Sequence, residues 1–197
     1  MFRYNNYQYE VRFLRAYFYF NLVRQYGDVP FTDHFMSADE SNSLGRTPAK
    51  DIFDYIISEC DEIKDLIIED YANLPADVVL PSESPETGRV NKATVLALKA
   101  RAALYAASPL FNGGYPEAIA LKDNQGKQLF PAKDDTKWKI ALDALQRFID
   151  YSKGRYSLYQ VMKNGEIDPA ESLYQLFQVS VNNSEAVWQS SKNSRSE

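Results

Sequence analysis

The stretch EVRFLRAYFYFNLVRQYGDVPFTD, residues 10–33, decides the fold of this chain. It predicts a helix from about Tyr7 to Tyr26 with apolar side chains on every side, and a helix that is hydrophobic all round is normally a buried one. Gly27 stands where a left-handed C-cap would, and Pro30 prevents the helix from continuing. The sequence therefore predicts a long buried helix that ends at a sharp turn.

Three further helices are predicted by apolar residues spaced three and four apart. Thr47 and Asn91 are the expected N-caps of the second and third helices, because short polar side chains accept hydrogen bonds from the first backbone N–H groups. Gly154 is the expected stop of the fourth helix. The predicted helices cover residues 47–67, 91–108 and 135–152.

The four helices repeat as two pairs. The dipeptide Arg15-Ala16 in the first helix matches Arg101-Ala102 in the third, a shift of 86 residues (101 − 15). Phe53 in the second helix matches Trp138 in the fourth, a shift of 85 residues (138 − 53). Such pairs are typical of tetratricopeptide (TPR) hairpins, in which a small residue lets the two helices approach closely. The two alanines are the predicted small residues.

The predicted fold is therefore mainly α, with TPR-like antiparallel hairpins at about 7–67 and 91–153 in a single domain of residues 1–197. Long insertions, Asp28–Arg46 and Pro109–Asp134, separate the two helices of each pair, and loops of this length are usually functional or disordered. Residues 154–197 form an irregular tail, in which SLYQLFQVS and EAVWQSS alternate like short strands.

Composition and motifs exclude several classes of protein. The net charge is −5 with no basic run, which argues against nucleic-acid binding. The single cysteine, Cys60, permits no internal disulfide and lies among isoleucines, as a buried thiol does. His34 alone cannot form a metal site, and no motif of a hydrolase, kinase or metalloprotease is present. We predict no catalytic residue, no metal and no cofactor.

Aromatic residues outside the helical stripes are the candidates for binding a sugar, because a ring stacks on the apolar face of a pyranose. Phe35 lies in the first insertion and Tyr115 in the second. Asn112, in SPLFNGGYPE, would add an amide for the sugar hydroxyls. Trp138 and Trp188 follow apolar patterns and are expected in the core.

Five blocks of the sequence resemble the SusD/RagB family in the expected order. The first and third are the most specific, and the third contains the SPL-F-N signature, which makes packing an alternative role for Asn112. The blocks are VRFLRAYFYFNLVRQYGDVPF, RTPAKDIFDYIISECDEIKDL, GRVNKATVLALKARAALYAASPLFNGG, KWKIALDALQRFID and NNSEAVWQSS.

The resemblance implies a TPR-like scaffold on a protein that a lipid tethers to the outward-facing surface of the outer membrane. There it would cover a SusC-like TonB-dependent transporter and capture oligosaccharide or polysaccharide for import, without catalysis. The sequence lacks a leader and a lipidation cysteine, so we interpret it as a fragment of a longer protein whose anchor lies elsewhere. A generic TPR scaffold for protein partners and an all-α carbohydrate-active enzyme remain the alternatives.

Overall fold

The structure is a computed structural model that describes residues 2–71, 88–122, 126, 128–179 and 183–188. It is mainly α, as the sequence predicts, with one two-stranded antiparallel sheet near the C-terminus. The elements are α1 (Phe2–Tyr26), α2 (Ala38–Ser43), α3 (Ala49–Ile63), α4 (Lys92–Ala107), α5 (Pro116–Ile119), α6 (Thr136–Ser152), β1 (Met162–Lys163), β2 (Glu166–Ile167) and α7 (Pro169–Leu176).

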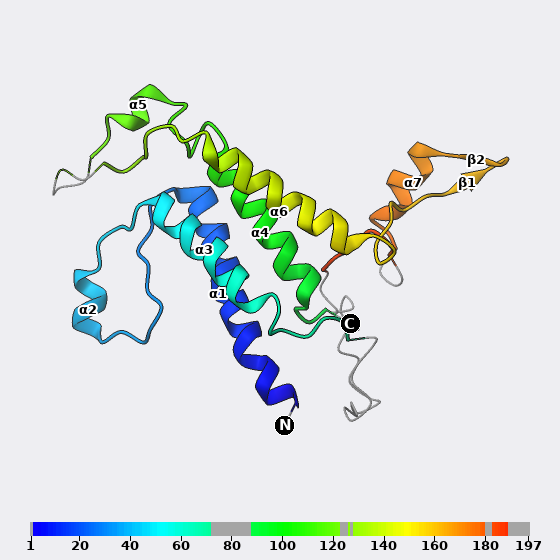
Figure 1. Ribbon diagram of the computed structural model, residues 1–197, viewed down its shortest axis with the longest axis horizontal. Helices are drawn as coiled ribbons and strands as arrows, with labels where there is room; N and C mark the ends of the chain where they lie inside the picture. The colour runs from blue at the N-terminus through cyan, green and yellow to red at the C-terminus, as the bar shows by residue number, and fades with distance from the viewer. Residues whose placement is uncertain (1, 72–87, 123–125, 127, 180–182, 189–197) are drawn as a thin grey trace, which may run out of the picture.

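The four long helices form a layered array (Figure 1). Helix α1 packs against α3, α3 against α4, and α4 against α6, while α1 and α4 touch to a smaller extent. Each helix of this array therefore contacts its hairpin partner, and the second helix of the first hairpin also contacts the first helix of the next. This arrangement is that of two tandem hairpins, and it confirms the predicted pairs.

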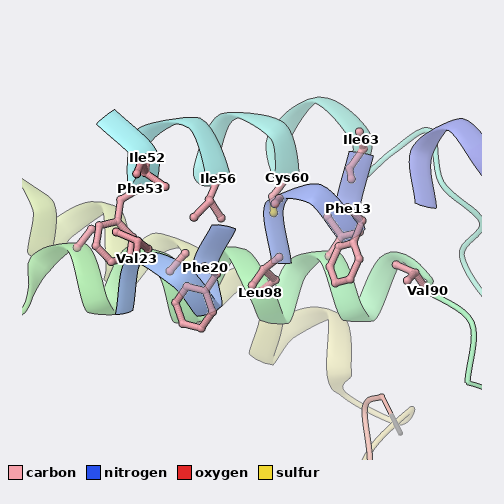
Figure 2. Close-up of a cluster of buried hydrophobic side chains, with 14 of the residues drawn as sticks. Phe13, Phe20, Val23, Ile52, Phe53, Ile56, Cys60, Ile63, Val90 and Leu98 are labelled. Atoms are coloured by element: carbon pink, nitrogen blue, oxygen red, sulfur yellow. The ribbon is translucent and has the colours of Figure 1, made fainter. Parts of the chain in front are cut away.

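One main core joins α1, α3 and α4 (Figure 2). It contains Cys60, whose burial raises the pKa of the thiol to about 12. The thiol therefore behaves as a small apolar group, as the sequence predicts. The largest members of this core are Phe13, Phe20, Val23, Ile52, Phe53, Ile56, Ile63 and Val95.

Helix α1 is not buried on every side, and this prediction from the sequence is wrong. Phe13 and Phe20 are buried, whereas Phe18 is 59% exposed and Val11 is 56% exposed. The reason is that α1 lies at the edge of the array, where α3 and α4 cover only part of its circumference. The helix also begins at Phe2, five residues before the predicted start.

The predicted ends of the helices are largely confirmed. Asn91 caps α4, with its side-chain oxygen accepting a hydrogen bond from the N–H of Thr94 at 3.1 Å. Gly27 and Gly154 adopt left-handed backbone conformations (φ 68° and 75°) just after α1 and α6. The prediction for Thr47 is wrong, because α3 begins at Ala49 and Thr47 instead forms an isolated bridge with the first insertion.

The sequence predicts that Ala102 brings α4 close to α6, but other alanines make this contact. Ala102 is fully buried, but it belongs to the core shared with α1 and α3. A second cluster joins α4 to α6 and consists of Ala100, Ala103, Ala107, Ala141 and Ala144. The shift of 86 residues therefore does not align equivalent faces of α1 and α4.

Replacing Ala102 by leucine is expected to overpack the contact between the two hairpins. The side chain has no exposed surface, so three extra carbon atoms must displace neighbouring core residues. We expect the free energy of unfolding to fall by about 1–3 kcal/mol, measured by urea denaturation. Arg101→Leu, at the exposed neighbouring position, is the control. Equal stability of Ala102→Leu and the parent protein would contradict the observed packing.

Trp138 on α6 is 45% exposed, so its predicted place in the core is wrong. The contact of α6 with α4 is made by Ala141 and Ala144, which allow the two backbones to approach closely. Trp138, three residues before Ala141, therefore lies beside the contact between α4 and α6 and not inside it.

The tail also differs from the prediction. The segment predicted as the strand SLYQLFQVS mostly lies in α7, which Asp168 caps by accepting from the N–H of Glu171 at 3.0 Å. The observed strands lie earlier, on either side of Asn164-Gly165, where both residues have positive φ (56° and 86°). Such a pair is a strong hairpin signal. In the second predicted strand, EAVWQSS, residues 185–188 form a turn and bends, and the remaining three residues lie outside the described residues.

Candidate ligand-binding insertions

The two insertions leave the array from the same end (Figure 1). This follows from the topology, because each insertion connects the C-terminal end of the first helix of a hairpin to the N-terminal end of the second. The first insertion, Asp28–Arg46, contains α2, and the second insertion, Pro109–Asp134, contains α5. The helical hairpins hold both insertions in place at this end of the array.

A buried carboxylate closes the base of the first insertion. Asp28 is 6% exposed, and its Oδ1 accepts a hydrogen bond from the N–H of Ala49 at 2.7 Å, at the start of α3. The N–H of Thr47 donates to the carbonyl of Val29 at 2.9 Å. Asp28 thereby acts as a remote N-cap for α3, because a helix N-terminus presents unpaired N–H groups and favours a negative charge.

Aromatic packing holds the next residues of the first insertion. The ring of Phe31 lies 4.8 Å from that of Tyr19 and 4.6 Å from that of Tyr55, measured between ring centroids. The N–H of Thr32 donates to the Tyr19 hydroxyl at 2.8 Å. Phe35 lies only three residues further on and is 96% exposed. The insertion is thus anchored up to Thr32 and then presents Phe35 to solvent.

A buried amide closes the base of the second insertion. Asn112 is 2% exposed, and its Nδ2 donates to the carbonyl of Asp134 at 2.9 Å while its Oδ1 accepts from the N–H of the same residue at 2.9 Å. Its Nδ2 also lies 3.4 Å from the carbonyl oxygen of Ala107. The amide therefore joins the two ends of the insertion, which supports packing as the role of Asn112.

Replacing Asn112 by aspartate should weaken this closure with almost no change of volume. The substitution removes the donor to the Asp134 carbonyl and places a carboxylate oxygen against it in a buried position. We expect a loss of about 1–3 kcal/mol of stability, measured by chemical denaturation. Asn164→Asp in the exposed β1–β2 turn is the matched control and should be close to neutral. Equal effects at both positions would argue against the closure.

The structure does not bring the three predicted binding residues together. Phe35 and Tyr115 lie on separate insertions, and Figure 1 shows these insertions as two distinct projections. Tyr115 precedes α5 and is 50% exposed, so its ring is available to a ligand. Sequence reasoning missed Asp28 and Phe31, although the GDVPF segment that contains both was part of the most specific sequence block.

Two exposed carboxylates of the insertions are hydrogen-bonded to neighbouring side chains. Hydrogen bonding to His34 lowers the pKa of the exposed Asp33 carboxyl. Hydrogen bonding to Thr136 likewise lowers the pKa of Asp134. Among the described residues, no three His, Cys, Asp or Glu side chains cluster closely enough to hold a metal ion. Within that same part of the chain, we find no helix with the length and hydropathy needed to cross a bilayer.

A shallow depression of about 440 Å³ lies elsewhere, beyond the end of α7. None of the predicted binding residues lines it. Its walls are formed by Leu176, Phe177, Gln178, Val179, Asn183, Glu185 and Ala186.

Solved structures with a similar arrangement include two of BT4246, one of them with selenomethionine. The first has 26% sequence identity and a TM-score of 0.70, covering 96% of this chain and 35% of that chain. The selenomethionine structure has 28% identity and a TM-score of 0.63, covering 81% of this chain and 26% of that chain. No protein-family model matches the chain, and no curated protein matches it.

Two SusD-like proteins from Bacteroides fragilis NCTC 9343 are also similar. BF3747 has 22% identity and a TM-score of 0.50, covering 79% of this chain and 22% of that chain. BF0978, described as a carbohydrate-binding protein, has 21% identity and a TM-score of 0.51, covering 77% of this chain and 22% of that chain. The chain thus spans about a fifth to a third of the length of the solved structures it matches. The resemblance to SusD-like proteins is confirmed, and the fold of this chain matches a part of theirs.

Proposed function

We propose that this protein captures glycans and does not convert them, as a SusD-like protein. The observation that carries the proposal is the pair of insertions that leave the helical array from one end, each closed at its base by a buried polar side chain. BF0978, which has a similar fold, is described as a carbohydrate-binding protein, and this supports a glycan as the ligand.

The proposed contacts are the rings of Tyr115 and Phe35. Each ring is exposed on an anchored insertion, so a sugar can cover it with little rearrangement of the protein. A tyrosine offers both an apolar face for the pyranose and a hydroxyl for hydrogen bonding. Because few groups would be buried, we expect weak binding, in the range from about 1 μM to 1 mM.

We further propose that the protein acts on the outward-facing surface of the outer membrane, held by a lipid anchor. It would hand the glycan to a SusC-like TonB-dependent transporter. Both proposals rest on the resemblance of the sequence blocks to SusD/RagB proteins, together with the shared fold.

Calorimetric titration with a panel of oligosaccharides tests the binding. Tyr115→Ala and Phe35→Ala should each weaken binding about 2- to 10-fold, since an aromatic stacking contact contributes about 0.5–1.5 kcal/mol. Tyr174→Ala and Phe177→Ala are the matched controls, because these rings are also exposed (63% and 82%) but lie on or just after α7. The controls should bind as the parent protein does.

Three results would contradict the proposal. Failure of every oligosaccharide in the panel to bind would remove glycan capture as the function. Release of reducing ends during incubation with polysaccharide would show instead that the protein is a carbohydrate-active enzyme. Equal loss of binding in the α7 controls would show that the ligand binds away from the insertions.

A further inference from the structure

A short segment, residues 183–188, joins the tail to the helical array, and we call it the strap. Near its beginning, the carbonyl of Ser184 accepts a hydrogen bond from the N–H of Ser157 at 3.0 Å, just after α6. At its end, Trp188 contacts α1. The strap therefore brings the tail back to the first helix of the array.

Trp188 binds the array through both its ring and its N–H group. Its ring centroid lies 5.6 Å from that of Phe13 and 5.1 Å from that of Tyr17, with interplanar angles of 86° and 85°. This edge-to-face geometry is the favourable one for aromatic pairs. The indole Nε1 donates to the carbonyl of Gly88 at 2.8 Å. Trp188 is 36% exposed, so it lies at the edge of the core and not inside it, as the sequence predicts.

The carbonyl that receives the indole lies directly before an ion pair with α1. Nη2 of Arg89 donates to Oε1 of Glu10 at 2.7 Å. The guanidinium group also lies over the ring of Tyr7, 4.6 Å from its centroid, which is a cation–π contact. Because Gly88 and Arg89 share a peptide bond, these contacts of Arg89 hold the backbone to which the indole binds.

Glu10 is the centre of a larger polar cluster on α1. It is 8% exposed, and the same Oε1 accepts from Nδ2 of Asn6 at 2.5 Å and from the hydroxyl of Tyr71 at 3.0 Å. The Oδ1 of Asn6 accepts from the N–H of Ile68 at 2.9 Å. Residues 68–71 follow α3, and Arg89 precedes α4. Glu10 therefore attaches both ends of the connection between the two hairpins to α1.

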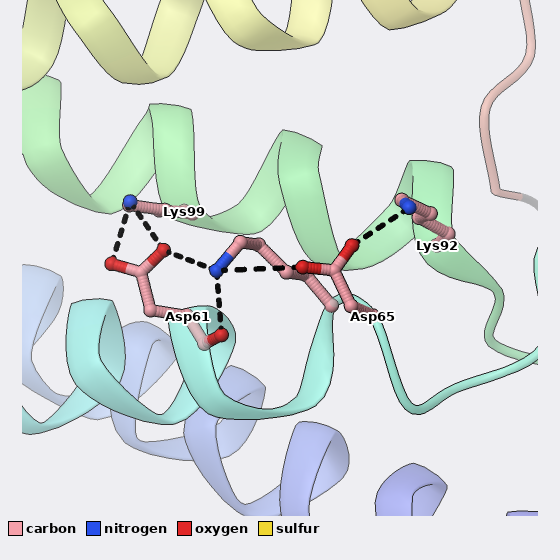
Figure 3. A network of polar contacts seen from close by, with 5 residues as sticks. Asp61, Asp65, Lys92 and Lys99 are labelled. Atoms are coloured by element: carbon pink, nitrogen blue, oxygen red, sulfur yellow. Dashed lines mark hydrogen bonds and ion pairs between the residues drawn. The ribbon is translucent and has the colours of Figure 1, made fainter.

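A second polar cluster fixes the start of α4 against the end of α3 (Figure 3). Lys92 donates to Asp65 at 2.8 Å, and Lys99 donates to both carboxylate oxygens of Asp61 at 2.7 and 2.6 Å. The backbone around Gly88 is thus held from α1 and from α3, and its carbonyl keeps a defined position for the indole.

We propose that the strap is a latch whose closure depends on the ion pair between Glu10 and Arg89. Trp188 closes the latch on α1, and the ion pair holds the Gly88 carbonyl where the indole N–H can reach it. The coupling between the ion pair and the indole runs through the backbone of residues 88 and 89. Opening of the latch releases the tail from α1 while the two hairpins stay folded.

Exchange of the Trp188 indole proton with water, followed by NMR, measures how often the latch opens, because a hydrogen-bonded proton exchanges from the open state. Arg89→Met removes the ion pair and keeps an unbranched side chain. It should raise this exchange rate about 2- to 10-fold, the range that corresponds to the loss of one hydrogen bond. The indole proton of Trp138, on α6, is the internal reference and should exchange as in the parent protein.

Arg12→Met is the matched control on the array. Nε of Arg12 donates to Glu59 at 2.9 Å, and this pair joins α1 to α3. The two ion pairs are similarly buried, with side-chain exposures of 31% and 14% for Arg12 and Glu59 and of 25% and 11% for Arg89 and Glu10. Arg12→Met should leave the exchange rate of the Trp188 indole unchanged. Circular dichroism would show that both variants are folded.

An unchanged exchange rate of the Trp188 indole in a folded Arg89→Met variant would overturn the proposal. An equal rise in Arg12→Met would also overturn it, because the strap would then respond to any loosening of α1. If Arg89→Met does not fold, Glu10→Gln provides the same test, because it removes the charge and keeps an acceptor oxygen. Glu10→Gln should raise the rate by a smaller factor, and the absence of any rise would contradict the latch.

Discussion

Phe20→Ala is expected to lower the free energy of unfolding by about 3–5 kcal/mol. Its side chain is 2% exposed and makes an edge-to-face contact with Tyr105 of α4, with ring centroids 5.3 Å apart. Removal of the ring leaves a cavity between the two hairpins, in a core where neighbouring side chains can collapse only partly.

Phe18→Ala provides the control on the same helix. Phe18 is 59% exposed, and substitution of such a residue should cost less than about 1 kcal/mol. Urea denaturation monitored by circular dichroism measures both changes. Similar costs for the two variants would contradict the finding that α1 buries only one face.

Gly113→Ala is expected to destabilise the protein by about 2–5 kcal/mol, because two separate costs add. The residue has φ 66°, a region that costs an L-amino acid about 1–2 kcal/mol. A β-carbon at this position would also lie 2.2 Å from the backbone nitrogen of Lys133, so the two ends of the second insertion would have to move apart. Overpacking of this kind adds about 1–3 kcal/mol.

Gly154→Ala separates these two costs. Gly154 has a similar φ of 75°, but a β-carbon there would meet no atom within 4 Å. Its substitution should therefore cost only the conformational part, about 1–2 kcal/mol. Thermal and urea denaturation of both variants give the comparison. If Gly113→Ala proved no more destabilising than Gly154→Ala, the close approach to Lys133 would be disproved.

The helices could be predicted from the sequence because their signals are local. Apolar spacing gives the stripe of α3, and Asn91 and Gly154 mark helix ends through hydrogen bonding and backbone geometry within a few residues. The exposure of Phe18 and Trp138 could not be predicted in this way. Apolar periodicity shows that a face can be buried, but the array must supply a neighbour to bury it.

The tail differs from its prediction at two places, the helix α7 and the β1–β2 hairpin, although short-range sequence signals favour both. The alternation in SLYQLFQVS suggests a strand, but the Asp168-Pro169 start, with a cap and a proline at the first helical position, favours the observed helix α7. The Asn164-Gly165 turn, with positive φ at both residues, is the stronger signal for a hairpin.

The base of each insertion depends on contacts between residues far apart in the sequence. Asp28 caps a helix that begins at Ala49, and Asn112 binds the backbone of Asp134. Composition alone does not distinguish such buried polar residues from ligand contacts, because both use carboxylates and amides. Phe35 and Tyr115 are exposed, and their roles as ligand contacts stay a prediction.

We propose that the helical platform presents two insertions that capture a glycan and leave it unchanged. Amide chemical-shift mapping by NMR, with the oligosaccharide that binds best in calorimetry, tests this claim most directly. We expect shift changes concentrated in Asp28–Arg46 and Pro109–Asp134, with the ligand recovered intact. Changes confined to α6 and α7, or cleavage of the ligand during the titration, would contradict it.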